Sequence, residues 1–118
     1  LIVSGDSWRY FAQKSAPATG WNNTAFTESP DWASGPSQLG YGNDGERTPL
    51  PFGSDPANKY ITAYFRKSIT IPNPAAFQSF TLRYKRDDGI ILYLNGVEIR
   101  REYMPAGAVG YGTLASQA

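Results

Sequence analysis

The sequence predicts an all-β fold, an antiparallel β-sandwich, on three observations. Residues 90–94 are apolar or aromatic and residues 97–100 alternate apolar and charged side chains, on either side of Asn95-Gly96, the pair that two-residue hairpin turns prefer because both positions need positive φ. Residues 60–71 and 80–86 alternate with the two-residue period of a strand. No segment of useful length repeats its apolar residues with the period of a helix.

The first half of the chain is predicted to join one short strand to a long ordered coil. The strand lies within residues 1–10, starting at Leu1-Ile2-Val3-Ser4 as in a processed or excised chain, and its Trp8 and Tyr10 are expected in the core. Residues 11–59 contain six Pro and six Gly, yet also large aromatic side chains that a disordered linker would lack. These aromatics are Phe11, Trp21, Phe26, Trp32, Tyr41 and Phe52.

From residue 60 onward the sequence predicts strands. In the strand over 60–71, Lys67 breaks the alternation and indicates a bulge or a frayed rim. Pro72 and Pro74 end the strand because neither donates to a ladder. Its inward face is predicted to hold Ile61, Ala63, Phe65, Ile69 and Ile71.

One helical turn over 74–77 is expected next, followed by a strand over 80–86 and then the hairpin. The inward side chains of 80–86 are predicted to be Phe80, Leu82 and Tyr84. In the hairpin, one apolar face holds Ile90, Leu92 and Leu94, and across the turn Val97 and Ile99 alternate with Glu98 and Arg100.

Composition excludes several classes of function. A length of 118 residues predicts a single domain over 1–118. The net charge of +1 argues against a nucleic-acid or an anionic membrane partner. The chain has no Cys and no His, which excludes disulfides, thiolate chemistry and the Ser-His-Asp and Cys-His arrangements. No apolar run approaches the roughly 18 residues of a membrane span.

Several short segments of the sequence, taken in chain order, resemble motifs of one family of protein modules. They are Ser7-Trp8-Arg9-Tyr10, the stretch 32–42, Tyr64-Phe65-Arg66-Lys67, the stretch 86–98 and Met104-Pro105. Together they are similar to the galactose-binding-domain-like jelly-roll modules appended to secreted bacterial carbohydrate-active enzymes, phosphoesterases and surface proteins. The resemblance implies a secreted or cell-surface location, a polysaccharide or glycan ligand, and neighbouring domains of a larger protein.

Modules of this family usually continue past the Met-Pro turn with closing strands. The resemblance therefore implies a domain that is incomplete at the C-terminus of this chain, because the strands counted above do not complete an eight-strand jelly roll. Either a second polypeptide chain supplies the missing strands or an edge of the core is left unpaired, and we expect the first.

Loop residues are the candidates for ligand contacts. Sugar-binding proteins stack flat aromatic rings on pyranose faces, with neighbouring polar groups bonding the hydroxyls. For Trp21, stacking and a purely structural role are left open, whereas Trp32 is expected to anchor the coil. The six candidates are Trp21, Tyr41, Asn43, Asp44, Arg47 and Tyr103.

Acidic and basic residues offer weaker hypotheses. Residues 39–47 hold oxygen ligands of the kind that Ca²⁺ accepts, but the spacing is not that of an EF-hand and ordinary turn chemistry is the favoured explanation, so no cofactor is predicted. Asp87 and Asp88 are neighbours on a strand and face opposite ways, so we expect them to bond loop amides or to pair with Arg66 or Arg86 rather than to catalyse.

Five basic side chains in the second half of the chain are expected to form a solvated face rather than a single-strand nucleic-acid surface. They are Arg66, Arg83, Lys85, Arg100 and Arg101.

The sequence thus predicts a non-catalytic extracellular module that tethers a partner enzyme or surface protein to polysaccharide. The alternative is a structural spacer or protein-interaction domain that packs on a neighbouring catalytic domain and binds no sugar. An enzyme is the least supported of the three, because no base, nucleophile or convergent carboxylate pair is recognisable.

Overall fold

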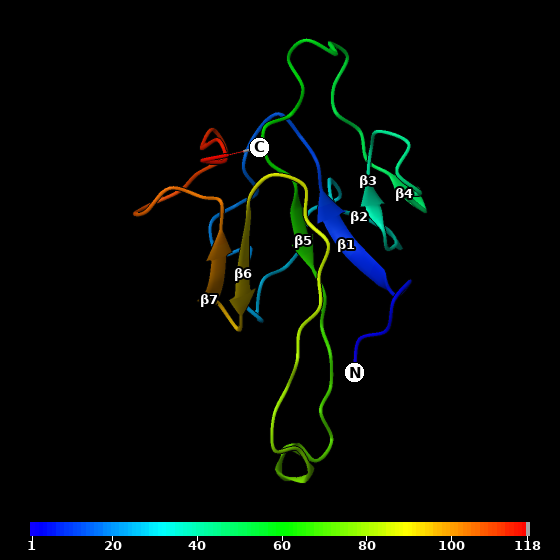
Figure 1. Ribbon diagram of the computed structural model, residues 1–118, viewed down its shortest axis with the longest axis vertical. Coiled ribbons are helices and arrows are strands. Elements are labelled where there is room, and N and C mark those ends of the chain that lie inside the picture. The colour runs from blue at the N-terminus through cyan, green and yellow to red at the C-terminus, as the bar shows by residue number, and fades with distance from the viewer. Residues whose placement is uncertain (118) are drawn as a thin grey trace.

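The computed structural model describes residues 1–117 and is all-β, as predicted (Figure 1). Across these residues seven strands form three small sheets, and the one helical element is the 3-10 turn η1, Pro74–Ala76. None of the described helical structure is long or apolar enough to cross a membrane. The strands are β1 (Ser7–Phe11), β2 (Ala33–Pro36), β3 (Leu39–Gly40), β4 (Thr48–Pro49), β5 (Tyr64–Arg66), β6 (Ile90–Leu94) and β7 (Val97–Glu102).

The largest sheet is antiparallel with the order β2-β1-β5. Its central strand begins at Ser7, so the strand start expected at Leu1-Ile2-Val3-Ser4 is wrong. A turn precedes β1 instead, in which the Asp6 carboxylate accepts the Val3 amide and Gly5 has a φ of 93°. The first residues are consequently exposed.

One face of this sheet carries the core, and coil residues build it. Phe11 of β1 and Trp32 are 5% and 4% exposed, and their ring centroids lie 5.5 Å apart. Tyr64 of β5 meets Phe11 edge-on at 6.2 Å, and Phe26 covers Trp32 at 6.0 Å. Trp32 therefore anchors the coil to the sheet, as predicted.

An ion-pair network closes the same face. Glu28 accepts from Arg9 at 2.7 Å and from Arg66 at 2.8 Å, so one carboxylate from the coil joins β1 to β5. The Arg66 guanidinium also lies 5.2 Å from the Phe26 ring centroid, within cation–π range. Aromatic packing and this network together fix the coil against the sheet.

The opposite face of the sheet is largely open, which corrects the predicted inward face of 60–71. Tyr64 points into the core, whereas Phe65, Ile61 and Ile69 are exposed, because the aromatic coil covers the Tyr64 side. The strand is confined to Tyr64–Arg66; at its end the Lys67 ammonium, rather than a ladder amide, donates to the Ser7 carbonyl.

Trp8 and Tyr10 of β1 are half-buried rather than core residues. Tyr10 is paired with the exposed Phe65, and the Lys67 ammonium lies 6.0 Å from the Trp8 ring. The prediction that these two aromatics fill the core is therefore wrong.

Residues 67–89, here called the arm, extend away from the sheet and return, with η1 at the far end (Figure 1). The helical turn is confirmed, but the strand predicted over 80–86 is wrong. Phe80 and Leu82 are 60% and 52% exposed instead of facing a core. The reason is that no strand of residues 1–117 lies in register beside this segment, and an unpaired strand is not stable in water.

The hairpin β6–β7 is confirmed. Its turn residues Asn95 and Gly96 have φ of 50° and 82°, the left-handed conformation that a type I′ turn requires. The register shifts in the middle, however, since Leu92 is paired with Arg100 but Tyr93 with Glu98. Ile99 is the extra residue of a β-bulge, so the predicted alternation fails there and Arg100 lies opposite Leu92.

The apolar face of the hairpin is not buried. Leu94, Val97 and Ile99 are 57%, 64% and 54% exposed. Residues 1–117 form only three small sheets, and the jelly-roll sandwich stays a prediction.

Candidate functional site

Four of the six predicted site residues lie on one loop, residues 41–47, which joins β3 to β4. The two strands pair in parallel, with Leu39 opposite Thr48, and the Leu50 amide donates to the Gly40 carbonyl at 2.8 Å. Thr48 is buried, and its hydroxyl donates to the Pro36 carbonyl at 2.7 Å. The base of the loop is thereby fixed to β2.

The loop turns sharply through residues with positive φ. Gly42, Asn43 and Gly45 have φ of 109°, 61° and 85°. Gly and Asn tolerate this region best among amino acids, which explains the Gly-Asn-Asp-Gly sequence as turn chemistry. The Glu46 carboxylate accepts the Asp44 amide at 2.9 Å and closes the turn.

A cleft of about 490 Å³ opens beside this loop, and we call it the Tyr41 cleft. The Tyr41 ring packs on Phe52 with centroids 5.0 Å apart and an interplanar angle of 56°. Tyr41 is 44% exposed, so part of the ring surface is available to a ligand. The cleft is lined by Gly40, Tyr41, Gly42, Asn43, Glu46, Pro49, Phe52, Pro56 and Lys59.

Polar groups of both signs reach the cleft. The Lys59 ammonium lies 5.4 Å from the centroid of Tyr41 and 5.4 Å from that of Phe52, a cation–π geometry. Within residues 1–117 it forms no ion pair, and neither does the carboxylate of Glu46. The cleft therefore offers an aromatic surface, a cation and a carboxylate in one place.

Asp44 and Arg47 lie on the same loop but outside the lining of the cleft. The Asp44 carboxylate accepts from Lys85 of the arm at 2.6 Å and from Gln38 at 3.3 Å. These two hydrogen bonds lower the pKa of Asp44. Arg47 is exposed, and its guanidinium lies against Gly5 of the N-terminal turn.

Trp21 and Tyr103 lie elsewhere in the molecule. Trp21 packs edge-on against Tyr64 at 5.0 Å and Tyr93 at 5.7 Å, which joins the coil to both β5 and the hairpin. Tyr103 lies under the Arg86 guanidinium at 3.9 Å. Of the six predicted residues, the structure brings Tyr41 and Asn43 together at the cleft.

Sequence reasoning missed the residues that complete the cleft, chiefly Phe52, Lys59 and Glu46. Phe52 stood out only as one more aromatic of the coil, and Lys59 lies 18 positions beyond Tyr41 in a segment with no periodicity. The available signal was the Pro-rich stretch 49–56, because prolines stiffen loops that hold aromatic rings in place.

The acidic residues form no metal site in the part of the chain that the structure describes, where no three potential ligands cluster. Asp87 and Asp88 also do not pair as predicted. Arg66 binds Glu28, and Arg86 binds Glu102 at 2.8 Å while donating to the main-chain carbonyl of Asp88.

Comparisons with protein-family models, with curated proteins and with solved structures returned no match. The resemblance to galactose-binding-domain-like modules therefore rests on those short segments of the sequence alone.

Proposed function

We propose that this chain is a non-catalytic carbohydrate-binding module of a secreted or cell-surface protein, with the Tyr41 cleft as its sugar site. The observation that supports the proposal best is the partly exposed Tyr41 ring, braced by Phe52 and flanked by a cation and a carboxylate. Sugar sites combine an apolar platform with a few convergent polar groups.

In this proposal a pyranose ring stacks on Tyr41. The Lys59 ammonium donates to a hydroxyl, the Glu46 carboxylate accepts from another, and the Asn43 amide does either. The bracing by Phe52 and by the positive-φ loop keeps the platform pre-formed, which lowers the entropy lost on binding. A single site of this size gives modest affinity, and tethering to a polysaccharide with many repeats raises it.

The family assignment and the jelly-roll architecture belong to the same proposal. The all-β structure, the confirmed Asn95-Gly96 hairpin and the anchoring by Trp32 support it. The non-catalytic role is supported by the absence of His and Cys from the sequence, which leaves the usual bases and nucleophiles unrepresented.

A structural or protein-interaction module is the second candidate. The exposed apolar faces of the hairpin and arm favour it, because apolar patches of that kind are typical of protein–protein interaction sites. Such a module packs against a neighbouring catalytic domain and leaves the Tyr41 cleft without a ligand.

Retention of the purified chain on polysaccharide gels separates the two candidates. A sugar site at the cleft predicts retardation by at least one polysaccharide, lost in Tyr41→Ala and kept in Tyr41→Phe, which preserves the ring. Phe77→Ala is the matched control, since Phe77 is also 44% exposed but lies next to η1 at the far end of the arm. If Tyr41→Ala and the parent chain are retained equally, the sugar site is not the Tyr41 cleft. If neither is retained on any polysaccharide, the structural module is supported.

A further inference from the structure

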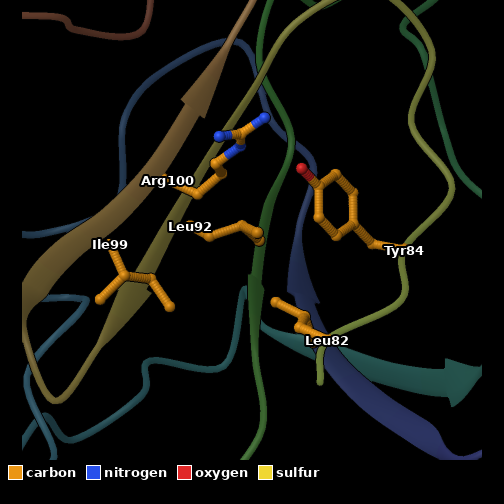
Figure 2. A pocket seen from close by; sticks show the side chains of 5 residues that line it. All are labelled: Leu82, Tyr84, Leu92, Ile99 and Arg100. Atoms are coloured by element: carbon orange, nitrogen blue, oxygen red, sulfur yellow. The ribbon is translucent and has the colours of Figure 1, made fainter. Parts of the chain in front are cut away.

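A hollow of about 350 Å³ lies between the arm and the hairpin, and we call it the slot. Leu82 and Tyr84 line it from the arm, and Leu92, Ile99 and Arg100 line it from the hairpin. Figure 2 shows Leu92 and Arg100 of the hairpin directed toward Tyr84 and Leu82 of the arm. Four of the five lining residues are apolar or aromatic, so the slot exposes a hydrophobic surface to water.

The bulge in β7 shapes the slot. Because Ile99 is the extra residue, both Ile99 and Arg100 reach it, whereas strict alternation would send them to opposite faces. Ile99 is 54% exposed and Leu82 is 52% exposed. Exposed apolar surface organised around a hollow is typical of a binding surface.

The backbone beside the slot also lacks partners, because its amides and carbonyls form few hydrogen bonds within the chain. Residues 78–89 form no backbone–backbone hydrogen bond with any of residues 1–117, although 80–86 have the alternation of a strand. β6 pairs only with β7 among the described strands, so no strand is paired with its second edge. Main-chain donors and acceptors of this kind are a template for one more strand.

Charge indicates what kind of strand fits. Residues 78–86 contain Arg83, Lys85 and Arg86 and no acidic residue. Within the described part of the chain Arg83 has no ion pair, whereas Lys85 is paired with Asp44, and Arg86 and Arg100 share Glu102. Basic side chains therefore still outnumber acidic ones beside the slot. The surroundings of the slot therefore attract a segment with acidic side chains and repel a basic one, including a second copy of 78–86.

We propose that the slot binds an extended β-strand supplied in trans by another polypeptide, in which apolar residues alternate with Asp or Glu. The apolar side chains fill the space between Leu82 and Leu92, and the main chain pairs with the backbone of residues 80–86 and β6. The acidic side chains point to the other face of the added strand, where Arg83 lies between Leu82 and Tyr84 in the sequence. This is recognition by strand addition, in which backbone bonds give affinity and alternate side chains give selectivity. It does not depend on sugar binding at the Tyr41 cleft.

The test titrates the full chain with a blocked nine-residue peptide that alternates Val with Glu, and with a second peptide that has Lys in place of Glu. We expect saturable calorimetric binding of the Glu peptide alone, together with slowed hydrogen exchange of the amides in 80–86 and in β6. Leu82→Lys is expected to weaken binding by at least about tenfold, through lost apolar contact and added repulsion. Leu82 is half-exposed in the free chain, so this substitution leaves the fold intact, as a circular dichroism melt checks.

Leu114→Lys is the matched control, since Leu114 is 68% exposed and lies outside the slot, and it is expected to bind like the parent chain. Equal binding of both peptides, or binding without protection of 80–86, overturns the proposal. Analytical sedimentation tests the last possibility, that the slot binds a second copy of the chain. A dimer that Leu82→Lys abolishes, together with no peptide binding, would show this and would also overturn the proposal. Sugar retention and its loss in Tyr41→Ala are measured separately, so the two proposals succeed or fail independently.

Discussion

The covered face of the β2-β1-β5 sheet and the open face of the hairpin show two ways in which apolar residues behave in one chain. On the covered face, Phe11 and Trp32 are nearly inaccessible, and an irregular coil supplies the covering rings. On the hairpin, Leu94 and Val97 are paired in regular strands yet are more than half exposed. Regular secondary structure therefore does not decide burial; the presence of a second layer does.

The first prediction concerns the packing on the covered face. Trp32→Ala takes away the ring that touches both Phe11 and Phe26, and we expect a loss of about 3–5 kcal/mol of unfolding free energy. Leu94→Ala is the control on the open face, and there we expect a change within about 0.5 kcal/mol. Urea denaturation followed by fluorescence measures both; equal losses would erase the contrast between the two faces.

The second prediction sharpens the account of the covered face. Glu28→Gln removes the charge shared by Arg9 and Arg66, and it leaves the largely buried Arg66 without a carboxylate. We expect a loss of about 1–3 kcal/mol. Glu98→Gln on the hairpin serves as the control. The side chain of Glu98 is 37% exposed against 18% for Glu28 and pairs with one arginine instead of two, and surface pairs contribute below about 1 kcal/mol. A smaller loss in Glu28→Gln than in Glu98→Gln contradicts the assigned role of Glu28.

The third prediction concerns the edge of the open face and has the smallest expected effect. Hydrogen bonds from Arg100, Arg86 and Tyr84 lower the pKa of Glu102 from its usual 4.5 to about 2. Because the folded chain holds this carboxylate ionised, its contribution to stability is complete above pH 4.5 and is lost as the pH falls toward 2.

Melting temperature measured between pH 5 and pH 2 checks this prediction. Glu102→Gln is expected to show a shallower decline than the parent chain over that window, since it has no proton to gain at this position. Parallel curves for the two chains would mean that Glu102 does not contribute to the acid sensitivity.

The sequence predicted the hairpin and the anchoring by Trp32 because both depend on local or compositional signals. Asn95-Gly96 specifies a turn almost regardless of its surroundings, and a large aromatic in a Pro-rich and Gly-rich coil has few other uses. The strand over 80–86 could not be judged in this way, because alternation reports that a segment is able to pair and says nothing about whether a partner exists.

The inward face of 60–71 failed for a related reason. The sequence shows which residues share a face, but which face is covered depended on where the coil aromatics packed, and they packed against Tyr64. At the candidate site, Tyr41 and Asn43 were accessible to sequence reasoning because they lie in a recognisable turn. Phe52 and Lys59 approach Tyr41 through tertiary contacts that no local pattern records.

The bond between Lys85 and Asp44 has a consequence of its own. It ties the arm to the loop that borders the Tyr41 cleft, and both side chains are more than 60% exposed. A tie of that kind is screened by dissolved ions, over a distance of about 8 Å at physiological ionic strength. At high salt concentration the ion pair is weakened and the two segments can separate. At low salt concentration it holds them together, so the ionic strength of the solution controls the contact between these two distant parts of the chain.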